Sequence, residues 1–128
     1  MSKKNRTPEI RPVFNWLKDV ADHDFDAAYA YLSMQFDDVT TKVLVASLRK
    51  AKITERRAND ILRACGRDPL PITDPGVLHN LLKVARGEPM SPVLVVNHGV
   101  DSDIADGFHR ISLVYSLDPF GMVPCRIA

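Results

Sequence analysis

The stretch from residue 91 to 128 constrains the fold most strongly, because it contains strand, turn, strand, helix and strand signals in close succession. The run SPVLVVN is unbroken, apolar and rich in β-branched residues, which is typical of a buried strand. HGVDS then predicts a turn and DIAD a return strand. An almost entirely apolar helix is expected from Phe108 to Leu117, and MVPCRI predicts a last strand after a DPFG turn. This order requires a small sheet with helices packed against it.

Upstream of this stretch, apolar residues at helical spacing predict a series of helices. We expect Asp24, Asp38 and Thr54 to act as N-caps of three of them, because short polar side chains satisfy the free N–H groups of a first turn. Val39 and Val43 are expected on a buried face. The four predicted helices cover residues 12–20, 24–36, 38–51 and 54–65.

The segment RDPLPITDP interrupts the helical pattern, since the residue before each proline favours an extended backbone. Leu70 and Ile72 are expected to form a short extended segment. Asp74 and Pro75 then provide an N-cap and a first helical residue, and the helix that they open is expected to end at Gly87. Its predicted core face carries leucines and other apolar residues: Val77, Leu78, Leu81, Leu82 and Ala85.

These patterns predict an α+β fold with a small mixed sheet and packed helices. Residues 1–11 read as a disordered basic tail. Residues 12–128 are expected to form a single domain, with a helical part at 12–67 and a sheet-containing part at 68–128. The first helices would supply core to a sheet that is too small to be stable alone.

Composition excludes several classes of protein. The 128 residues and 45% hydrophobic content suit one domain with a real core. A net charge of +1 gives no general argument for nucleic acid or an anionic membrane. No apolar run approaches the ~20 residues of a membrane span, and the polar start MSKKNRTPEI is not a secretory signal. Cys65 and Cys125 lie far apart, so a reducing cytoplasm is the expected compartment.

Charge is unevenly placed along the chain. Residues 19–38 contain six aspartates and no Lys or Arg, whereas residues 49–67 contain seven basic residues against two acidic ones. Two interpretations follow. The segments lie near each other and neutralise, or the basic segment borders a site for an anionic ligand.

The heptapeptide DGFHRIS, residues 106–112, breaks a local rule. Helix starts favour negative charge, yet His109 and Arg110 stand in the first predicted turn. An anion would resolve the conflict, because the free N–H groups of Phe108, His109 and Arg110, a guanidinium and an imidazole would meet on one group. Gly107 permits the sharp turn. The alternative is structural: Asp106 caps the helix and pairs with Arg110 four residues later.

The segment IADGFHRISLVY, placed between strand and helix and followed by VPCRI, resembles the ParB/sulfiredoxin superfamily. The resemblance covers about residues 70–128. It implies a helix start that holds nucleotide phosphates, with Gly107, His109 and Arg110 at the phosphate-binding positions. Phe108 stands where sulfiredoxins have their nucleophilic cysteine, which argues against sulfiredoxin chemistry. No helical DNA-binding domain follows the motif, which argues against a role in partition.

The leading hypothesis is therefore a nucleotide- or phosphate-binding protein, as a regulator or as a small phosphotransferase or nucleotide hydrolase. Asp106 and His109 are its candidate catalytic residues, and Gly107, Phe108, His109 and Arg110 its candidate phosphate-binding residues. The candidate accessory residues are Lys52, Arg57 and Ser112. The ligand is either a nucleotide with Mg²⁺ or another phosphate-bearing molecule.

Two other functions stay open. One is a non-enzymatic interaction or regulatory domain with a degenerate site. The other is DNA binding or a ParB-like nuclease, because residues 39–51 and 54–65 have the lengths of a helix-turn-helix with Arg56, Arg57 and Asn59 at the second start. His98, Asp101, Asp103 and His109 are the residue types that could bind a metal, but no metal site is predicted, since a turn rich in Asp, Gly and Asn needs no metal. The oligomeric state is not indicated.

Overall fold

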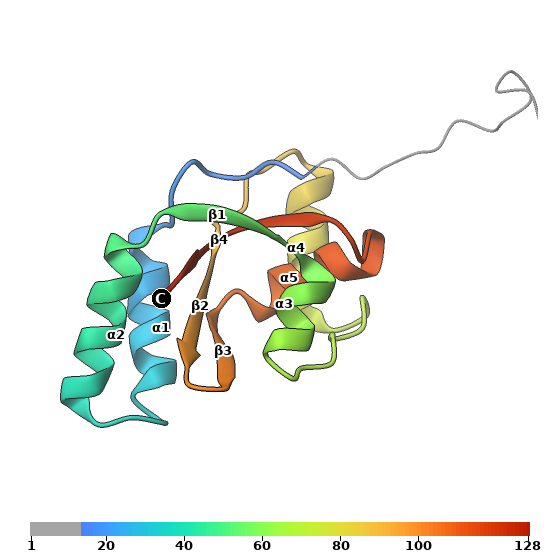
Figure 1. Ribbon diagram of the computed structural model, residues 1–128. Helices are drawn as coiled ribbons and strands as arrows, with labels where there is room; N and C mark the ends of the chain where they lie inside the picture. Colours follow the sequence, from blue (N-terminus) through green and yellow to red (C-terminus); the bar gives the residue numbers. More distant parts are fainter. Residues whose placement is uncertain (1–13) are drawn as a thin grey trace, which may run out of the picture.

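The computed structural model describes residues 14–128, so the predicted tail at 1–11 lies outside the described residues. The chain forms an α+β fold in which one mixed sheet of four strands is covered on both faces (Figure 1). The helices are α1 (Asp22–Leu32), α2 (Asp38–Lys50), α3 (Ala58–Ala64), α4 (Pro75–Ala85) and α5 (Phe108–Leu117). The strands are β1 (Ile53–Arg57), β2 (Val93–His98), β3 (Asp101–Asp106) and β4 (Met122–Ile127). The predicted fold class is confirmed.

The sheet has the order β1-β4-β2-β3. Strands β2 and β3 form the predicted hairpin, and β4 returns parallel to β2 after α5. On the other side of β4, β1 pairs antiparallel, with Thr54 opposite Cys125 and Arg56 opposite Val123. The central position of β4 explains why its VPC core is buried on both faces.

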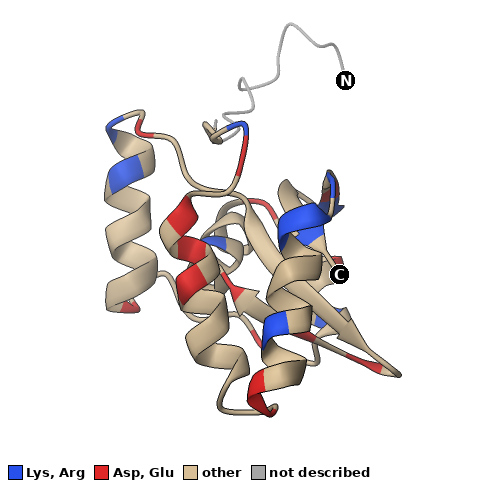
Figure 2. Cartoon of the chain, turned by 90° about the vertical axis from the view of Figure 1, so that its left-hand side faces the viewer, with Lys and Arg blue, Asp and Glu red and all other residues tan. Residues whose placement is uncertain are grey.

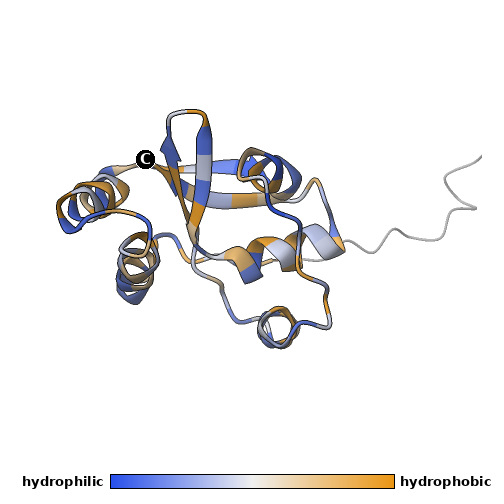
Figure 3. Cartoon of the chain, turned by 90° about the horizontal axis from the view of Figure 1, so that it is seen from below, coloured by the Kyte–Doolittle hydropathy of each residue, from blue (hydrophilic) through white to orange (hydrophobic). Residues whose placement is uncertain are grey.

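Helices α1 and α2 cover one face of the sheet, and α3 and α5 cover the other, with α4 packed outside α5 (Figure 3). The alternation of β2 serves both layers, because Leu94 and Val96 face α1 and α2 while Val93 and Val95 face α3 and α5. The first helices therefore supply half of the core, as expected. Trp16 helps close the second layer with Phe14.

Several predictions for residues 14–72 are wrong. Residues 14–20 form no helix; instead Trp16 bridges to Met90 in extended pairing. Thr54 is not an N-cap, because residues 53–57 are strand β1, and a helix-turn-helix is therefore not formed. The alternating side chains of ITERR and the free edge of β4 favour pairing over helix. Residues 70–72, predicted to be extended, lie in no strand.

Helix faces and caps also differ from expectation in part. Asp74 and Pro75 open α4 as predicted, since the Asp74 carboxylate accepts hydrogen bonds from the N–H groups of Gly76 and Val77. Helix α2 is capped by Asp37 instead of Asp38. Its predicted core residues Val39 and Val43 are exposed, as are Leu78 and Leu82 of α4. Both helices are covered on one side only, so their apolar stripes are wider than their buried faces.

Acidic and basic side chains gather separately on the face formed by α1 and α2. Asp residues gather in the first turns of α1, and Lys and Arg lie at the end of the neighbouring α2 (Figure 2). The two segments touch through Arg49, whose guanidinium carbon lies 4.3 Å from the centre of the Phe25 ring. Among residues 14–128 no ion pair joins the acidic segment 19–38 to the basic segment 49–67. The two segments therefore lie near each other, as one interpretation expected, but among residues 14–128 they do not neutralise each other through direct ion pairs.

No helix of the described chain is both long and apolar enough to cross a membrane.

Candidate functional site

The motif DGFHRIS lies where it was expected, at the junction between β3 and α5. Gly107 adopts a left-handed conformation with φ of 107° and begins the helix without a capping side chain. A Cβ at this position would lie 2.4 Å from Cγ1 of Val93. The glycine is therefore required by the turn and by the packing of β2 against it. The space next to it is filled by Val93, so this side of Gly107 does not face a ligand.

The first turn of α5 borders a cavity of about 340 Å³, which we name the α5 cavity. Gly107, His109 and Arg110 form one wall. The other walls come from the start of α1, from α4 and from the segment that precedes β2. Their polar lining residues are His23, Asp24, Asn80, Lys83 and Ser91. Four separate segments of the chain thus meet at the predicted motif.

The N–H groups that begin α5 are unpaired, and two of the three, those of His109 and Arg110, belong to residues that line this cavity. The first hydrogen bond of the helix runs from the N–H of Ile111 to the carbonyl of Gly107, 3.0 Å away. Within the described chain, no hydrogen bond is made by the N–H groups of Phe108, His109 or Arg110. Free donors at a helix start carry partial positive charge and bind anions. The start of α5 therefore has a built-in preference for a negatively charged group.

The Arg110 side chain has a different role from the one that the motif predicts. Its guanidinium is only 12% exposed. It donates to Asp106 Oδ2 at 2.6 Å, to Asp24 Oδ2 at 3.1 Å and to the Ser91 carbonyl at 2.5 Å. The structural alternative, pairing of Asp106 with Arg110, is thus present in the structure. Asp106 does not cap the helix, however, and a second carboxylate joins from α1.

Asp24 was predicted to cap α1, and that prediction is wrong. Ala21 occupies the N-cap, and the Asp24 side chain turns inward, where 6% of the residue is exposed. Asp24 and Asp106 together place two carboxylates around the one guanidinium of Arg110. Burial raises the pKa of the Asp106 carboxyl, and the charge of Arg110 opposes that shift. The cluster ties α1, β3 and α5 together.

His109 lies at the mouth of the cavity and contacts α4. Its Nε2 is 3.5 Å from Asp74 Oδ2, the oxygen that also caps α4. A Cβ on Gly76 would lie 2.3 Å from Cδ2 of His109, so the imidazole rests on the backbone of the first turn of α4. About half of the imidazole is exposed. His109 can therefore reach a ligand while its position is set by α4.

Four predicted site residues lie elsewhere. The Phe108 ring points away from the cavity into the core, and the Arg67 guanidinium stacks on it at 4.1 Å. Ser112 is fully buried, and its hydroxyl accepts a hydrogen bond from the N–H of Leu70. Neither Lys52 nor Arg57 lines the cavity. These residues have no side-chain contact with the α5 cavity, so their predicted site roles have no support.

The polar cavity residues that the motif did not indicate are His23, Asp24, Ser91, Asn80 and Lys83. Asn80 and Lys83 lie three apart on α4, which places them on one face, but only the docking of α4 on α5 brings them to the motif. The acidic run at 19–38 was the only sequence signal for Asp24. Neither signal identifies the partner segment.

The residues considered for a metal do not assemble. His98 and Asp103 meet at the β2–β3 hairpin, with Nε2 and Oδ2 2.6 Å apart. His109 lines the α5 cavity instead. Residues 14–128 contain no group of three or more His, Cys, Asp or Glu side chains placed to hold a metal ion.

Comparison of the chain with protein-family models, curated proteins and solved structures gives no significant match.

Proposed function

We propose that this chain is a binding module for a phosphate-bearing small molecule, which it holds in the α5 cavity. The observation that carries the proposal is the set of three unpaired N–H groups at the start of α5. The helix behind them is anchored by the buried residues Ile111, Leu113 and Val114. A rigid helix start with free donors favours an anion without reorganisation on binding.

Different walls of the α5 cavity offer different groups for binding. Lys83 offers a positive charge from α4, and His23 and His109 offer ring nitrogens. Arg110 already pairs with two carboxylates and has no free charge for a ligand, so this side chain acts as a positioning residue that fixes the first turn of α5. The phosphate would therefore be bound by backbone donors and Lys83.

The resemblance to the ParB/sulfiredoxin superfamily supports a nucleotide as the phosphate-bearing ligand. No chemical step is proposed. The candidate base Asp106 uses Oδ2 to accept from Arg110, and the neighbouring carboxylate of Asp24 is paired with the same guanidinium. Because no set of side chains is arranged for a metal, Mg²⁺ would enter only as the counterion of a nucleotide.

Calorimetric titration at low ionic strength tests the proposal, with inorganic phosphate, ATP, CTP and GTP, each with and without Mg²⁺. We expect binding of at least one of these anions. Lys83→Ala should weaken it about tenfold, as expected for one lost charge-assisted hydrogen bond. Lys42→Ala is the matched control, because Lys42 lies on α2 and pairs with Asp38. Absence of binding by all four ligands, or equal weakening by both variants, contradicts the proposal.

A second candidate is an interaction domain, and one observation favours it. Helices α2 and α4 each expose two apolar residues four positions apart, Val39 and Val43 at 73% and 59%, and Leu78 and Leu82 at 43% and 52%. Exposed apolar stripes mark contact surfaces when they are contiguous. Sedimentation over a range of concentrations tests a second copy as the partner. Self-association that is lost in Leu82→Glu supports this candidate, and a monomer at every concentration removes it.

A further inference from the structure

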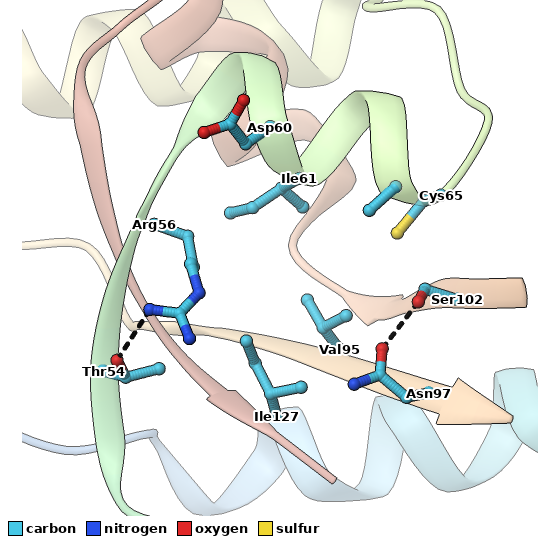
Figure 4. Close-up of a pocket in the computed structure, with 10 residues that line it drawn as sticks. Thr54, Arg56, Asp60, Ile61, Cys65, Val95, Asn97, Ser102 and Ile127 are labelled. Carbon is cyan, nitrogen blue, oxygen red and sulfur yellow. Dashed lines mark hydrogen bonds between the residues drawn. The ribbon is translucent and has the colours of Figure 1, made fainter. Parts of the chain in front are cut away.

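A second and larger cavity opens beneath α3, on the sheet face that α3 and α5 share (Figure 4). Its volume is about 470 Å³, within the range of small-molecule sites. We name it the α3 cavity. It is lined by residues of α3 and of all four strands. The ParB/sulfiredoxin-like motif does not contribute to it.

The floor of the α3 cavity is apolar. Ile61 projects from α3, Val95 from β2 and Ile127 from β4, and all three point into the same space (Figure 4). Val95 and Ile61 belong to the core cluster of this face. Ile61 and Val95 are each only 5% exposed, so Ile127 supplies most of the exposed apolar surface of these three residues. Covering that surface with the apolar body of a ligand removes it from water.

Arg56 stands at one end of the cavity with its charge uncompensated. Strand β1 places it on the inner face, opposite Val123. Its Nη1 donates to Thr54 Oγ1 at 3.2 Å and to the Glu55 carbonyl at 3.1 Å, and both acceptors are neutral. Asp60 also lines the cavity but forms its ion pair with Arg63, at 3.6 Å. The remaining guanidinium donors are therefore available to an anion.

Comparison with the other arginines of the described chain makes Arg56 distinctive. Four of them pair with carboxylates: Arg63, Arg86, Arg110 and Arg126. Three stack on aromatic rings: Arg49, Arg57 and Arg67. Within residues 14–128, Arg56 has neither kind of partner. A guanidinium that is directed over an apolar floor and lacks a carboxylate is suited to receive one from a ligand.

The opposite end of the cavity is polar and neutral. The Ser102 hydroxyl donates to Asn97 Oδ1 at 2.6 Å across the hairpin, which fixes the amide and leaves Nδ2 free to donate. Figure 4 shows Nδ2 directed back toward the middle of the cavity. Cys65 stands beside this pair, and burial raises the pKa of its thiol to about 11, so the group is uncharged at neutral pH. This end suits a ligand carbonyl or hydroxyl oxygen.

We propose that the α3 cavity binds a small organic carboxylate with an apolar body. The carboxylate would accept hydrogen bonds from Arg56, the body would cover Ile61, Val95 and Ile127, and a terminal oxygen would accept from Asn97 Nδ2. A single guanidinium matches a single negative charge. Asp60 also lines the cavity and repels a phosphate dianion more strongly than a carboxylate monoanion.

Titration of the ¹⁵N-labelled protein with cinnamate, followed by NMR, tests the proposal. Cinnamate has a flat apolar body and one carboxylate, and cinnamamide is its neutral counterpart. We expect saturable shifts at the amides of Ile61, Val95 and Asn97, with cinnamate bound about tenfold more tightly than cinnamamide. Arg56→Gln should abolish this preference. Arg57→Gln is the matched control, since Arg57 follows directly but stacks on Phe120 outside the cavity.

Several results would overturn the proposal. One is the absence of any saturable shift at millimolar cinnamate. Another is a preference for cinnamate that survives in Arg56→Gln. A third is a set of shifts confined to the exposed leucines of α4. Phenyl phosphate bound more tightly than cinnamate would overturn the assignment to carboxylates. The spectrum of Arg56→Gln without ligand shows whether the variant is folded.

Discussion

Arg110 and Arg56 make an instructive pair. Arg110 belongs to the motif that breaks a local charge rule, and the fold surrounds its guanidinium with two carboxylates and a carbonyl. The sequence indicates Arg56 only as part of a helix-turn-helix that does not form, yet among residues 14–128 it is the arginine without a carboxylate or an aromatic partner. An unfavourable charge within one helix is thus compensated from a distance, here by Asp24, which lies 86 positions away. Whether an arginine charge is free for a ligand therefore depends on all of its partners in the folded chain.

Removal of the Arg110 guanidinium should have the largest effect. Arg110→Ala leaves Asp24 and Asp106 buried beside each other, and breaking a buried pair costs about 3–5 kcal/mol of unfolding free energy. Urea unfolding at pH 7 measures it. Arg86→Ala is the control, because its pair with Glu88 is exposed and should cost less than about 1 kcal/mol. Equal effects of the two changes would mean that Arg110 is not the internal tie described above.

The turn before α5 should be the next most sensitive point. In Gly107→Ala, the new Cβ would lie 2.4 Å from Val93 while φ stays at 107°. Backbone strain and overpacking together should lower the unfolding free energy by about 2–4 kcal/mol. Gly66 also has a positive φ, of 60°, but nothing lies within 4 Å of its missing Cβ. Gly66→Ala should therefore cost only about 1 kcal/mol. Thermal and urea unfolding compare the two, and a smaller loss in Gly107→Ala contradicts the packing.

The pH dependence of stability should have opposite signs at two aspartates. Burial raises the pKa of Asp106, so the folded state holds that proton more tightly and the contribution of this group to stability falls as pH rises above the ordinary carboxyl range. Hydrogen bonding to Arg126 lowers the pKa of Asp19, so its contribution is present above that range and is lost as pH falls through it.

Unfolding free energies of Asp106→Asn and Asp19→Asn between pH 3 and 7 measure these signs. Relative to wild type, Asp106→Asn should become more stable as pH rises, and Asp19→Asn less stable. Parallel trends for the two variants would refute the assigned environments.

The smallest effect is expected at Arg56. Its side chain is exposed and bonded to neutral acceptors, so Arg56→Gln should change the unfolding free energy by less than about 0.5 kcal/mol. Together with Arg110→Ala this separates an arginine that holds the fold from one that is free for a ligand. A loss above about 2 kcal/mol in Arg56→Gln would place it in the first group.

Local signals in the sequence were sufficient to predict those elements whose hydrogen bonds and turns are formed by neighbouring residues. The cap at Asp74, the hairpin of β2 and β3, the turn at Gly107 and helix α5 all follow from neighbouring residues. Thr54 shows the limit, because a helix start and an edge strand compete there and pairing with β4 decides.

The candidate site was predictable in position but not in composition. The motif located the N–H donors of α5, whereas Lys83 and Asp24 reach it only through packing of α4 and α1. Ser112 looked like a site residue because of its polarity, and the structure uses its hydroxyl to anchor Leu70. Long-range contacts of this kind leave no periodic signal in a single sequence.

The central claim, that the start of α5 is an anion site, is tested most directly by NMR titration with inorganic phosphate. The amide signals of Phe108, His109 and Arg110 should shift together and saturate, because their N–H groups gain an acceptor. The Ile111 signal should move little, since its N–H already bonds to the Gly107 carbonyl. Unchanged signals for the first three amides at high phosphate concentration would contradict the claim.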